Sequence, residues 1–261
     1  MKIIASIITA AFLALNIQSC LSINPSGNKR VVASKNYVTK DIRVDSFKGI
    51  KIKGSANVVF TQKSGRPGVE VYTSDNVVDL LDIYVEDGTL YISLKRGYSI
   101  SNDKTEMRIS SADLNNIAVV GSGDILLKNG LTTDNLNISI AGSGDINGDN
   151  ITCDNFKTSI AGSGNLTMKN VKTTKTEISI AGSGDIYLSG ITEEADYSIA
   201  GAGDIKASDL QAKRVTASIS GAGDIKCYAT KYLKTRISGM GNIGYKGDPE
   251  LDTGKKGLYK L

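Results

Sequence analysis

The sequence contains no histidine and no tryptophan, and it has only three prolines, three cysteines and 6% aromatic residues among its 261 positions. Without histidine, a Ser-His-Asp or Cys-His hydrolase, a His-ligated zinc or haem site and a histidine-based pH switch are all excluded. The net charge is only +4, from 31 basic and 27 acidic residues. Because nucleic-acid binding requires a clustered basic face, this small surplus predicts that no nucleic acid is a partner.

Long hydrophobic runs are also missing, apart from one at the N-terminus. Residues 3–15 follow Lys2 and are apolar except for Ser6 and Thr9. A helix needs about 20 apolar residues to cross a bilayer, so this run is too short to span and is typical of the central part of a signal peptide. We therefore predict a signal peptide over residues 1–19, and no later segment is apolar enough to span a membrane.

The predicted signal peptide ends in Ile17-Gln18-Ser19-Cys20, which resembles the lipidation motif of bacterial lipoproteins. That motif places an aliphatic residue three positions before the cysteine and small residues just before it, and Gln18 departs from it. We predict that Cys20 is lipidated and that residues 20–36 are a tether. The alternative is an ordinary signal peptide with an incidental cysteine. No acidic pair follows Cys20, which favours an outer-membrane lipoprotein facing the periplasm over a surface-exposed one.

Glycine, in contrast, is abundant, and half of the 28 glycines belong to seven copies of one motif. The motif reads Gly, a small residue, Gly, Asp or Asn, then Ile or Leu, and successive copies are 18 to 21 residues apart. Self-similarity near a period of 20 indicates a solenoid. A Cβ atom at such a corner would clash or would need a positive φ, which glycine tolerates. The copies begin at Gly121, Gly142, Gly162, Gly182, Gly201, Gly221 and Gly239.

Aliphatic residues recur two positions before and four positions after the first glycine of every copy. Alternation with a period of two is typical of strands, and paired glycines every 20 residues would break helices. The sequence therefore predicts an all-β fold, a parallel β-helix or solenoid of about seven 20-residue turns over residues 117–245. A third, looser aliphatic column contains Leu131, Ile151, Val171, Ile191 and Leu210.

Each copy also carries a polar residue after its second glycine, and together these are Asp124, Asp145, Asn165, Asp185, Asp204, Asp224 and Asn242. One hypothesis is calcium binding, as in Gly-Asp-rich β-rolls, but those repeat every nine residues. The other is a hydrogen bond to backbone N–H groups at the corner, which Asn makes as well as Asp. We favour the second and predict no metal and no cofactor. We also expect an exposed or backbone-bonded serine ladder at Ser139, Ser159, Ser179, Ser198 and Ser218.

The segments on either side of the array have a different sequence pattern. Residues 37–116 contain alternating strands separated by turns, and we expect an antiparallel β region that caps the first coil. Within it, residues 53–58 look like a degenerate copy of the repeat. Residues 246–261 are expected to cap the other end. Cys153 and Cys227 lie in different repeats, too far apart for a disulfide, and are predicted to be two separate buried thiols.

The serial AGSGDI units, with FKGIKIKGSANVVFTQ before them and GYKGDP after them, resemble the family described as "putative auto-transporter adhesin, head GIN domain". The resemblance covers residues 46–261. It implies a right-handed β-helix-like fold in exported, lipid-anchored proteins of Bacteroidetes-type bacteria and an adhesin role, and it supplies no catalytic residues. The TGKKGLYKL end departs from the family's usual final Gly-x-Gly, which leaves the last coil undetermined.

We therefore predict a non-catalytic, lipid-anchored envelope protein that presents a rigid β-solenoid for binding or adhesion. Its expected partners are the membrane, through the lipid anchor, and an envelope polymer, glycan or protein. One alternative is a polysaccharide-processing enzyme on a β-helix scaffold, and another is a purely structural protein of envelope assembly. A glycosidase needs two carboxylates about 5–9.5 Å apart across a cleft, and the repeated column singles out no such pair.

Overall fold

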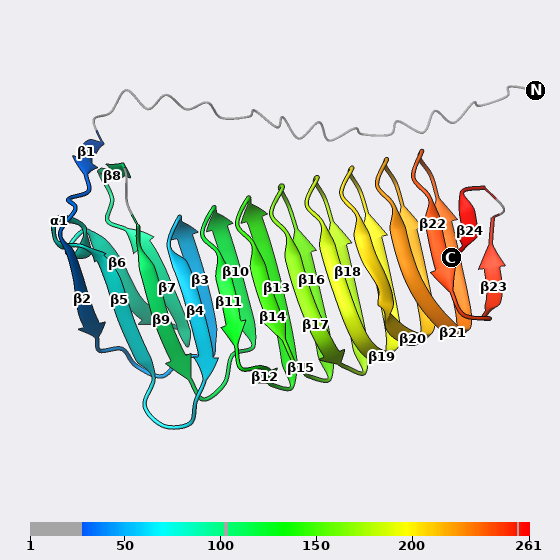
Figure 1. The fold of residues 1–261 in the computed structure, drawn as a ribbon, viewed down its shortest axis with the longest axis horizontal. Helices are drawn as coiled ribbons and strands as arrows, with labels where there is room; N and C mark the ends of the chain where they lie inside the picture. Colours follow the sequence, from blue (N-terminus) through cyan, green and yellow to red (C-terminus); the bar gives the residue numbers. More distant parts are fainter. Residues whose placement is uncertain (1–27, 102–103, 255) are drawn as a thin grey trace, which may run out of the picture.

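The computed structural model describes residues 28–101, 104–254 and 256–261, which form 24 strands and one short helix. The strands lie side by side along one long axis, as Figure 1 shows. No helix in these ranges has the length and apolar character needed to cross a bilayer. The predicted all-β solenoid of stacked parallel coils is confirmed.

One coil of the array consists of a strand, the Gly-x-Gly corner, a second strand and a second turn. Equivalent strands of neighbouring coils pair in parallel, so that Ile140 lies opposite Ile160 and Ile160 opposite Ile180. The strands before the corner are β10 (Asn116–Gly121), β13 (Asn135–Gly142), β16 (Asn155–Ile160) and β18 (Lys175–Ile180). Those after it are β11 (Ile125–Lys128), β12 (Leu131–Thr132), β14 (Ile146–Asp149), β15 (Ile151–Thr152) and β17 (Leu166–Lys172).

In the later coils, single strands run from one Gly-x-Gly corner to the next. These are β19 (Ile186–Ile199), β20 (Ile205–Ile219) and β21 (Ile225–Ile237), and each pairs in parallel with the next. All the register shifts between paired coils fall near the second turn, for example between Met168 and Val171. The second turn therefore absorbs the differences in repeat length, whereas the Gly-x-Gly corners stay in register.

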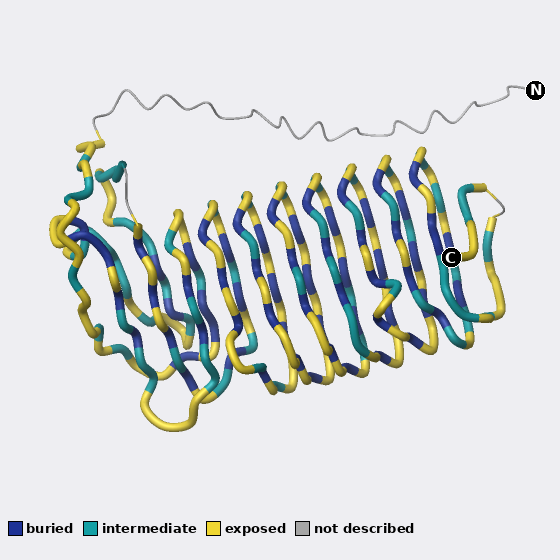
Figure 2. Tube along the Cα trace, viewed as in Figure 1, coloured by how far each residue is buried: buried dark blue, intermediate teal, exposed yellow. Residues whose placement is uncertain are grey.

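The core is the space between the two strand layers of the coil. Buried and exposed residues alternate along the strands of the repeat array, as Figure 2 shows. Of the two regular aliphatic columns, every member is buried except Ile237 in the last full coil, which is half-buried. Burial of each such side chain stabilises the fold by roughly 1.5–3 kcal/mol. One coil alone buries too few of them to fold, so the stability belongs to the stack.

The third aliphatic column contains one exception. Leu131, Ile151, Val171 and Leu210 are buried, but Ile191 is 51% exposed. The repeat is one residue shorter there, so Gly190 pairs with Val171 and Leu210 in the column position. The expectation that Ile191 belongs to the core is therefore wrong, because the register at the second turn moves it to the outside.

The parallel array begins earlier than the expected boundary at residue 117. The strands β3 (Gly49–Gly54) and β4 (Asn57–Gln62) pair in parallel with β10 and β11. Gly54 lies opposite Gly121, and Val58 lies opposite Ile125. Residues 53–58 are thus a true copy of the corner, as their sequence suggested.

Beyond this coil, the N-terminal end has the antiparallel pairs that were predicted for a cap. The strands β7 (Thr89–Leu94) and β9 (Glu106–Ser111) still pair in parallel with β3 and β4. Outside them, β6 (Leu81–Glu86) is antiparallel to β7, and β5 (Gly68–Ser74) is antiparallel to β9 and to β2 (Tyr37–Ile42). The helix α1 (Asp75–Val78) follows β5, and β1 (Lys29–Val32) with β8 (Tyr98–Ser101) forms a separate two-stranded sheet.

At the C-terminal end, the chain adds one more, incomplete coil. The strand β22 (Ile243–Lys246) pairs with β21, and β24 (Leu258–Lys260) pairs in parallel with β22. The strand β23 (Glu250–Thr253) pairs in parallel with β21 on the other layer. The last coil is therefore parallel and closes without a Gly-x-Gly corner.

Cys153 and Cys227 are free and buried, as predicted. Burial raises the pKa of the Cys153 thiol to about 11 and that of the Cys227 thiol to about 12. A thiol is nucleophilic only as the thiolate. Both side chains therefore serve as small apolar groups of the core.

We expect neither thiol to react with an aromatic disulfide reagent at pH 8 in the folded chain that carries Cys20→Ser. The raised pKa values leave only a very small thiolate fraction, and burial blocks access. In denaturant, both thiols should react rapidly, and the absorbance of the released aromatic thiolate gives the number of thiols that have reacted. Rapid reaction of either thiol without denaturant would contradict the burial described here.

Candidate functional site

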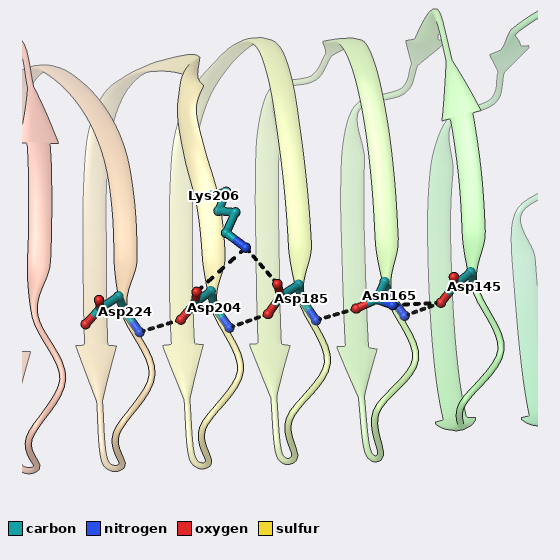
Figure 3. Close-up of polar contacts among 6 residues, drawn as sticks. All are labelled: Asp145, Asn165, Asp185, Asp204, Lys206 and Asp224. Atoms are coloured by element: carbon teal, nitrogen blue, oxygen red, sulfur yellow. Dashed lines mark hydrogen bonds and ion pairs between the residues drawn. The ribbon is translucent and has the colours of Figure 1, made fainter.

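The Asp and Asn side chains after the corner glycines form a continuous ladder of hydrogen bonds, part of which is drawn in Figure 3. At each step, Oδ1 of one residue accepts a hydrogen bond from the backbone N–H of the next residue, at 2.7–3.1 Å. The ladder starts at Asn57 and ends at Asn242. The predicted role at the corner is confirmed, with the donor supplied by the next coil.

The corner backbone explains why this N–H group uses a side chain. The backbone N–H of Ser183 donates to the carbonyl of Gly162 in the preceding coil at 2.8 Å. The backbone N–H of Ile186 donates instead to the carbonyl of Asp204 in the following coil, at 2.9 Å. The direction of donation thus reverses at Asp185, whose N–H lies between them and has no carbonyl partner. The side chain of Asn165 in the preceding coil accepts it at 2.9 Å. An unpaired N–H there would cost about 1–3 kcal/mol.

Two carboxylates of the ladder share one cation. Lys206 places its ammonium 2.7 Å from Oδ2 of Asp185 and 3.7 Å from Oδ2 of Asp204, as Figure 3 shows. Burial disfavours the charged form of Asp185, but the Lys206 ammonium and the Asp204 N–H outweigh burial and hold the pKa of Asp185 below its usual value. Where Asn165 interrupts the carboxylates, its side-chain amide donates to Asp145 at 3.0 Å. The ladder therefore stacks carboxylates one coil apart with a partner at each step.

Within the described ranges, no three acidic or cysteine side chains are grouped so that they could hold a metal ion. In each carboxylate of the ladder, Oδ1 already accepts a hydrogen bond from the next coil. This geometry provides a structural role for the column.

We expect Asp185→Asn to change the free energy of unfolding by less than about 1 kcal/mol. Asparagine keeps Oδ1 and loses only a half-exposed ion pair with Lys206. Asp185→Ala leaves the Asp204 N–H without an acceptor and should cost about 1–3 kcal/mol. Denaturant unfolding measures both. A melting temperature that rises in millimolar calcium, and rises less in Asp185→Asn, would overturn this interpretation and make the ladder a metal site.

The same pair gives an expected dependence on pH. Because the pKa of Asp185 is lowered in the folded chain, its ionised form adds stability above the unfolded pKa of about 4, and this part is lost as the pH falls through the folded pKa. The stability difference between wild type and Asp185→Asn should therefore shrink in acid.

An outer surface of mostly small side chains covers the layer of strands that precede the corners, and a shallow hollow of about 290 Å³ lies on it beside Ser179, Ser198 and Ser218. We call this surface the serine face, and it consists of the outward residues of β13, β16, β18 and the second halves of β19, β20 and β21. The predicted serine ladder lies along it and is exposed except for the half-buried Ser218. The hydroxyls of Ser179 and Ser218 donate to backbone carbonyls of the neighbouring coil at 3.4 Å. The next outward column is also small and exposed, with Ala141, Ala161, Ala181, Ala200 and Ser220.

Charged and aromatic side chains border the serine face. Lys175 and Lys157 both pair with Glu177, the latter at 3.4 Å, and the Lys175 contact is the main cause of the lowered pKa of Glu177. Further along, the guanidinium of Arg214 lies 5.5 Å from the ring centroid of Tyr232. The face thus combines a centre of small residues with ionic and aromatic groups that reach from one coil to the next.

Two cavities lie in the N-terminal cap. One, of about 590 Å³, contains the ion pair between Lys48 and Asp113, whose charged atoms are 3.2 Å apart. The other, of about 580 Å³, lies beside β2 and β6 and includes Arg43 and Arg66. Sequence analysis gave no signal for either cavity, because their lining residues do not repeat.

The predicted lipidation site Cys20 and the predicted signal peptide of residues 1–19 lie outside the described residues, which begin at Asn28. Both therefore stay predictions. The expected tether, residues 20–36, is described only from Asn28 onward, and it includes β1.

Comparison with known proteins agrees with this architecture. The family model described as "putative auto-transporter adhesin, head GIN domain" matches residues 46–158 and 146–249. A search of curated proteins gave no significant match.

Three crystal structures from related bacteria resemble the chain. A "putative lipid binding protein" of Parabacteroides distasonis is 31% identical, with 89% of this chain and all of that one covered and a TM-score of 0.84. A "putative adhesin" of Parabacteroides merdae is 28% identical, covering 89% and 95%, with a TM-score of 0.81. A "putative adhesin" of Bacteroides fragilis is 32% identical, covering 88% and 95%, with a TM-score of 0.65.

Proposed function

The chain belongs to the family described as "putative auto-transporter adhesin, head GIN domain", and we propose that it is a non-catalytic, lipid-anchored envelope protein that binds through its rigid β-solenoid. The partner is an envelope polymer, a glycan or another protein. The anchor is an acyl-modified Cys20 in the outer membrane, with the solenoid facing the periplasm. The adhesin names of two solved relatives support the binding role.

The serine face is the observation that carries this proposal. Its central side chains are small over successive coils, and each coil repeats the same pattern one strand spacing further along. A regular surface of this kind suits a polymer or a protein partner with its own extended contact area. The carboxylates of the corner ladder, in contrast, accept backbone N–H groups of the next coil at Oδ1, which supports a structural role for them.

The binding test uses the chain from residue 20 onward with Cys20→Ser, probed against glycan arrays and envelope fractions. We expect binding that is lost when Ser159 and Ser179 are both replaced by arginine, because two long side chains would obstruct the centre of the serine face. The matched control places arginines on the opposite layer, at Asn147 and Thr167. Loss in both variants would argue against the serine face, and turnover of a glycan that one carboxylate substitution abolishes would replace binding by catalysis.

Lipidation has its own test. Labelled palmitate should enter the wild-type chain expressed in a host with lipoprotein processing, and it should not enter Cys20→Ala. The wild type should also fractionate with membranes, because several acyl chains give stable anchoring. Equal labelling of both chains would refute the assignment of Cys20 and would leave the binding role of the solenoid untouched.

A further inference from the structure

The two-stranded sheet of β1 and β8 is separate from the solenoid and lies at its N-terminal end, as Figure 1 shows. The strands are parallel, with Lys29 opposite Tyr98 and Val32 opposite Ser101. The backbone N–H of Lys29 also donates to the carbonyl of Gly97 at 2.8 Å. This pairing joins the segment that leads from the N-terminus to the turn that follows β7.

Five cationic side chains lie on these two strands or within three residues of them in the sequence. They are all exposed, and we call them the tether-exit patch: Lys29, Arg30, Lys35, Lys95 and Arg96. Lys95 donates to the backbone carbonyl of Asp79 at 2.7 Å. In the part of the chain that the structure describes, none of the five takes part in an ion pair.

The acidic side chains of the neighbouring helix α1 and its end are held by other groups. Asp75 accepts hydrogen bonds from Ser34 and from Asn36, the latter at 2.8 Å. Asp79 pairs with Lys40 at 2.9 Å, and Lys40 and the nearby charge of Lys95 both lower its pKa. The other four cations of the tether-exit patch have no ion-pair partner among the described residues, so their charge can attract a ligand from outside the chain. Val32, on the same short sheet, is 61% exposed.

The position of the patch along the chain indicates the ligand. Cys20 precedes Lys29 by nine residues, which can span at most about 30 Å even when fully extended. If Cys20 carries acyl chains in a membrane, the patch is held within that distance of the headgroups. Lys and Arg side chains next to a membrane are attracted to anionic lipids, and they are the second signal that strengthens a lipid anchor.

We propose that the tether-exit patch docks on anionic lipid headgroups, so that the solenoid stands with its N-terminal cap against the membrane and its repeats directed away. The proposal rests on the proposed lipid anchor for its setting in the cell. The surface itself is a property of the folded chain. It should therefore bind anionic membranes without any acyl chain, although more weakly.

The experiment measures sedimentation of the unlipidated chain, residues 20–261 with Cys20→Ser, with vesicles. We expect binding to phosphatidylethanolamine vesicles that contain phosphatidylglycerol, and none to vesicles of phosphatidylcholine. Binding should disappear as salt is raised from about 0.1 M to about 1 M, because the screening length falls from about 10 Å to about 3 Å. Failure of palmitate labelling would reject the anchor and would not affect this result.

The test variant replaces Lys29, Arg30, Lys35 and Arg96 by glutamine. The partition coefficient should fall about fivefold for each cation removed, and about 100-fold or more for all four. The matched control removes the same charge from the solenoid body, by glutamine at Lys172, Lys226, Lys231 and Arg236. It should change binding by less than about fivefold.

Hydrogen exchange on the unsubstituted chain gives a measurement that does not depend on the folding of a variant. Anionic vesicles should slow the exchange of the backbone amides of β1 and β8 and leave those of β23 unchanged. The proposal is overturned if the control variant loses as much binding as the patch variant. It is also overturned if vesicles protect the repeats and not β1, or if anionic and neutral vesicles bind equally.

Discussion

Replacing Gly182 with valine is expected to prevent folding or to lower the free energy of unfolding by about 3 kcal/mol or more. A Cβ atom at this position would lie 2.1 Å from the carbonyl oxygen and 2.8 Å from the amide nitrogen of Gly162. Both atoms belong to a backbone that is hydrogen-bonded into the preceding coil, so they cannot move aside as a side chain would. Overpacking usually costs about 1–3 kcal/mol, and valine adds two methyl groups to the clash.

The physical reason differs in part from the one expected from sequence. The corner glycines of the first copies, such as Gly121 and Gly142, have a positive φ, but Gly182 does not. Its requirement for glycine therefore comes from the close approach of two coils and not from a left-handed backbone. Differential scanning calorimetry of the variant and the wild type measures the loss, which is a large part of a typical total stability of roughly 5–15 kcal/mol.

Substitutions at two other glycines distinguish a clash between coils from strain of a left-handed backbone. Gly54 has a φ of +125°, and no atom lies within 4 Å of the place that an added Cβ would take, so Gly54→Ala should cost only the backbone strain of about 1–3 kcal/mol. Gly254 has neither a positive φ nor a close neighbour, so Gly254→Val should be nearly silent. A melting temperature of Gly182→Val that equals the wild type would show that the coils can separate at the corner.

A single glycine inserted between Ser183 and Gly184 is expected to unfold the protein, whereas one inserted between Asn150 and Ile151 is expected to be tolerated. The first insertion lies in a corner where every coil is in register, and it displaces Asp185 from both of its ladder neighbours. Because side chains alternate along a strand, a shift of one residue also turns the core residues outward.

The second insertion reproduces a turn that the chain already contains. In the preceding coil, two residues with positive φ, Asn129 and Gly130, stand directly before Leu131, which pairs with Ile151. Before Ile151 itself, only Asn150 has a positive φ, so this turn is one residue shorter. The added glycine should therefore change the free energy of unfolding by less than about 1 kcal/mol. Urea unfolding of the two purified chains compares them directly. Equal stability of both insertions would contradict the different roles of the two turns.

The period, the strand columns and the corner ladder could be predicted because the same residue types recur at the same positions seven times. The presence of Asn165 and Asn242 in the Asp column showed that one oxygen, and not the charge, was required. Sequence alone did not show that the donor of each bond lies in the following coil, because that depends on the reversal of the backbone bonds at the corner.

The misplacement of Ile191 and the late start of the predicted array have another cause. Where the spacing between copies changes, a different residue of the repeat falls into the third aliphatic column. In this coil Gly190, and not Ile191, lies opposite Val171 and Leu210. In the N-terminal cap, strands such as β7 and β9 join the parallel stack without the corner motif. Pairing of this kind is set by three-dimensional contact, and no local pattern marks it.

The corner ladder has a direction, since each coil supplies an acceptor to the next and receives one from the coil before. A duplicated gene segment that encodes one 20-residue unit would therefore fit at either side of its parent with every bond retained. Each such duplication would lengthen the molecule by about 4.8 Å and leave both ends unchanged. The number of copies thus sets the length of the solenoid. Descendants of one ancestral chain can become longer without any new kind of contact between coils.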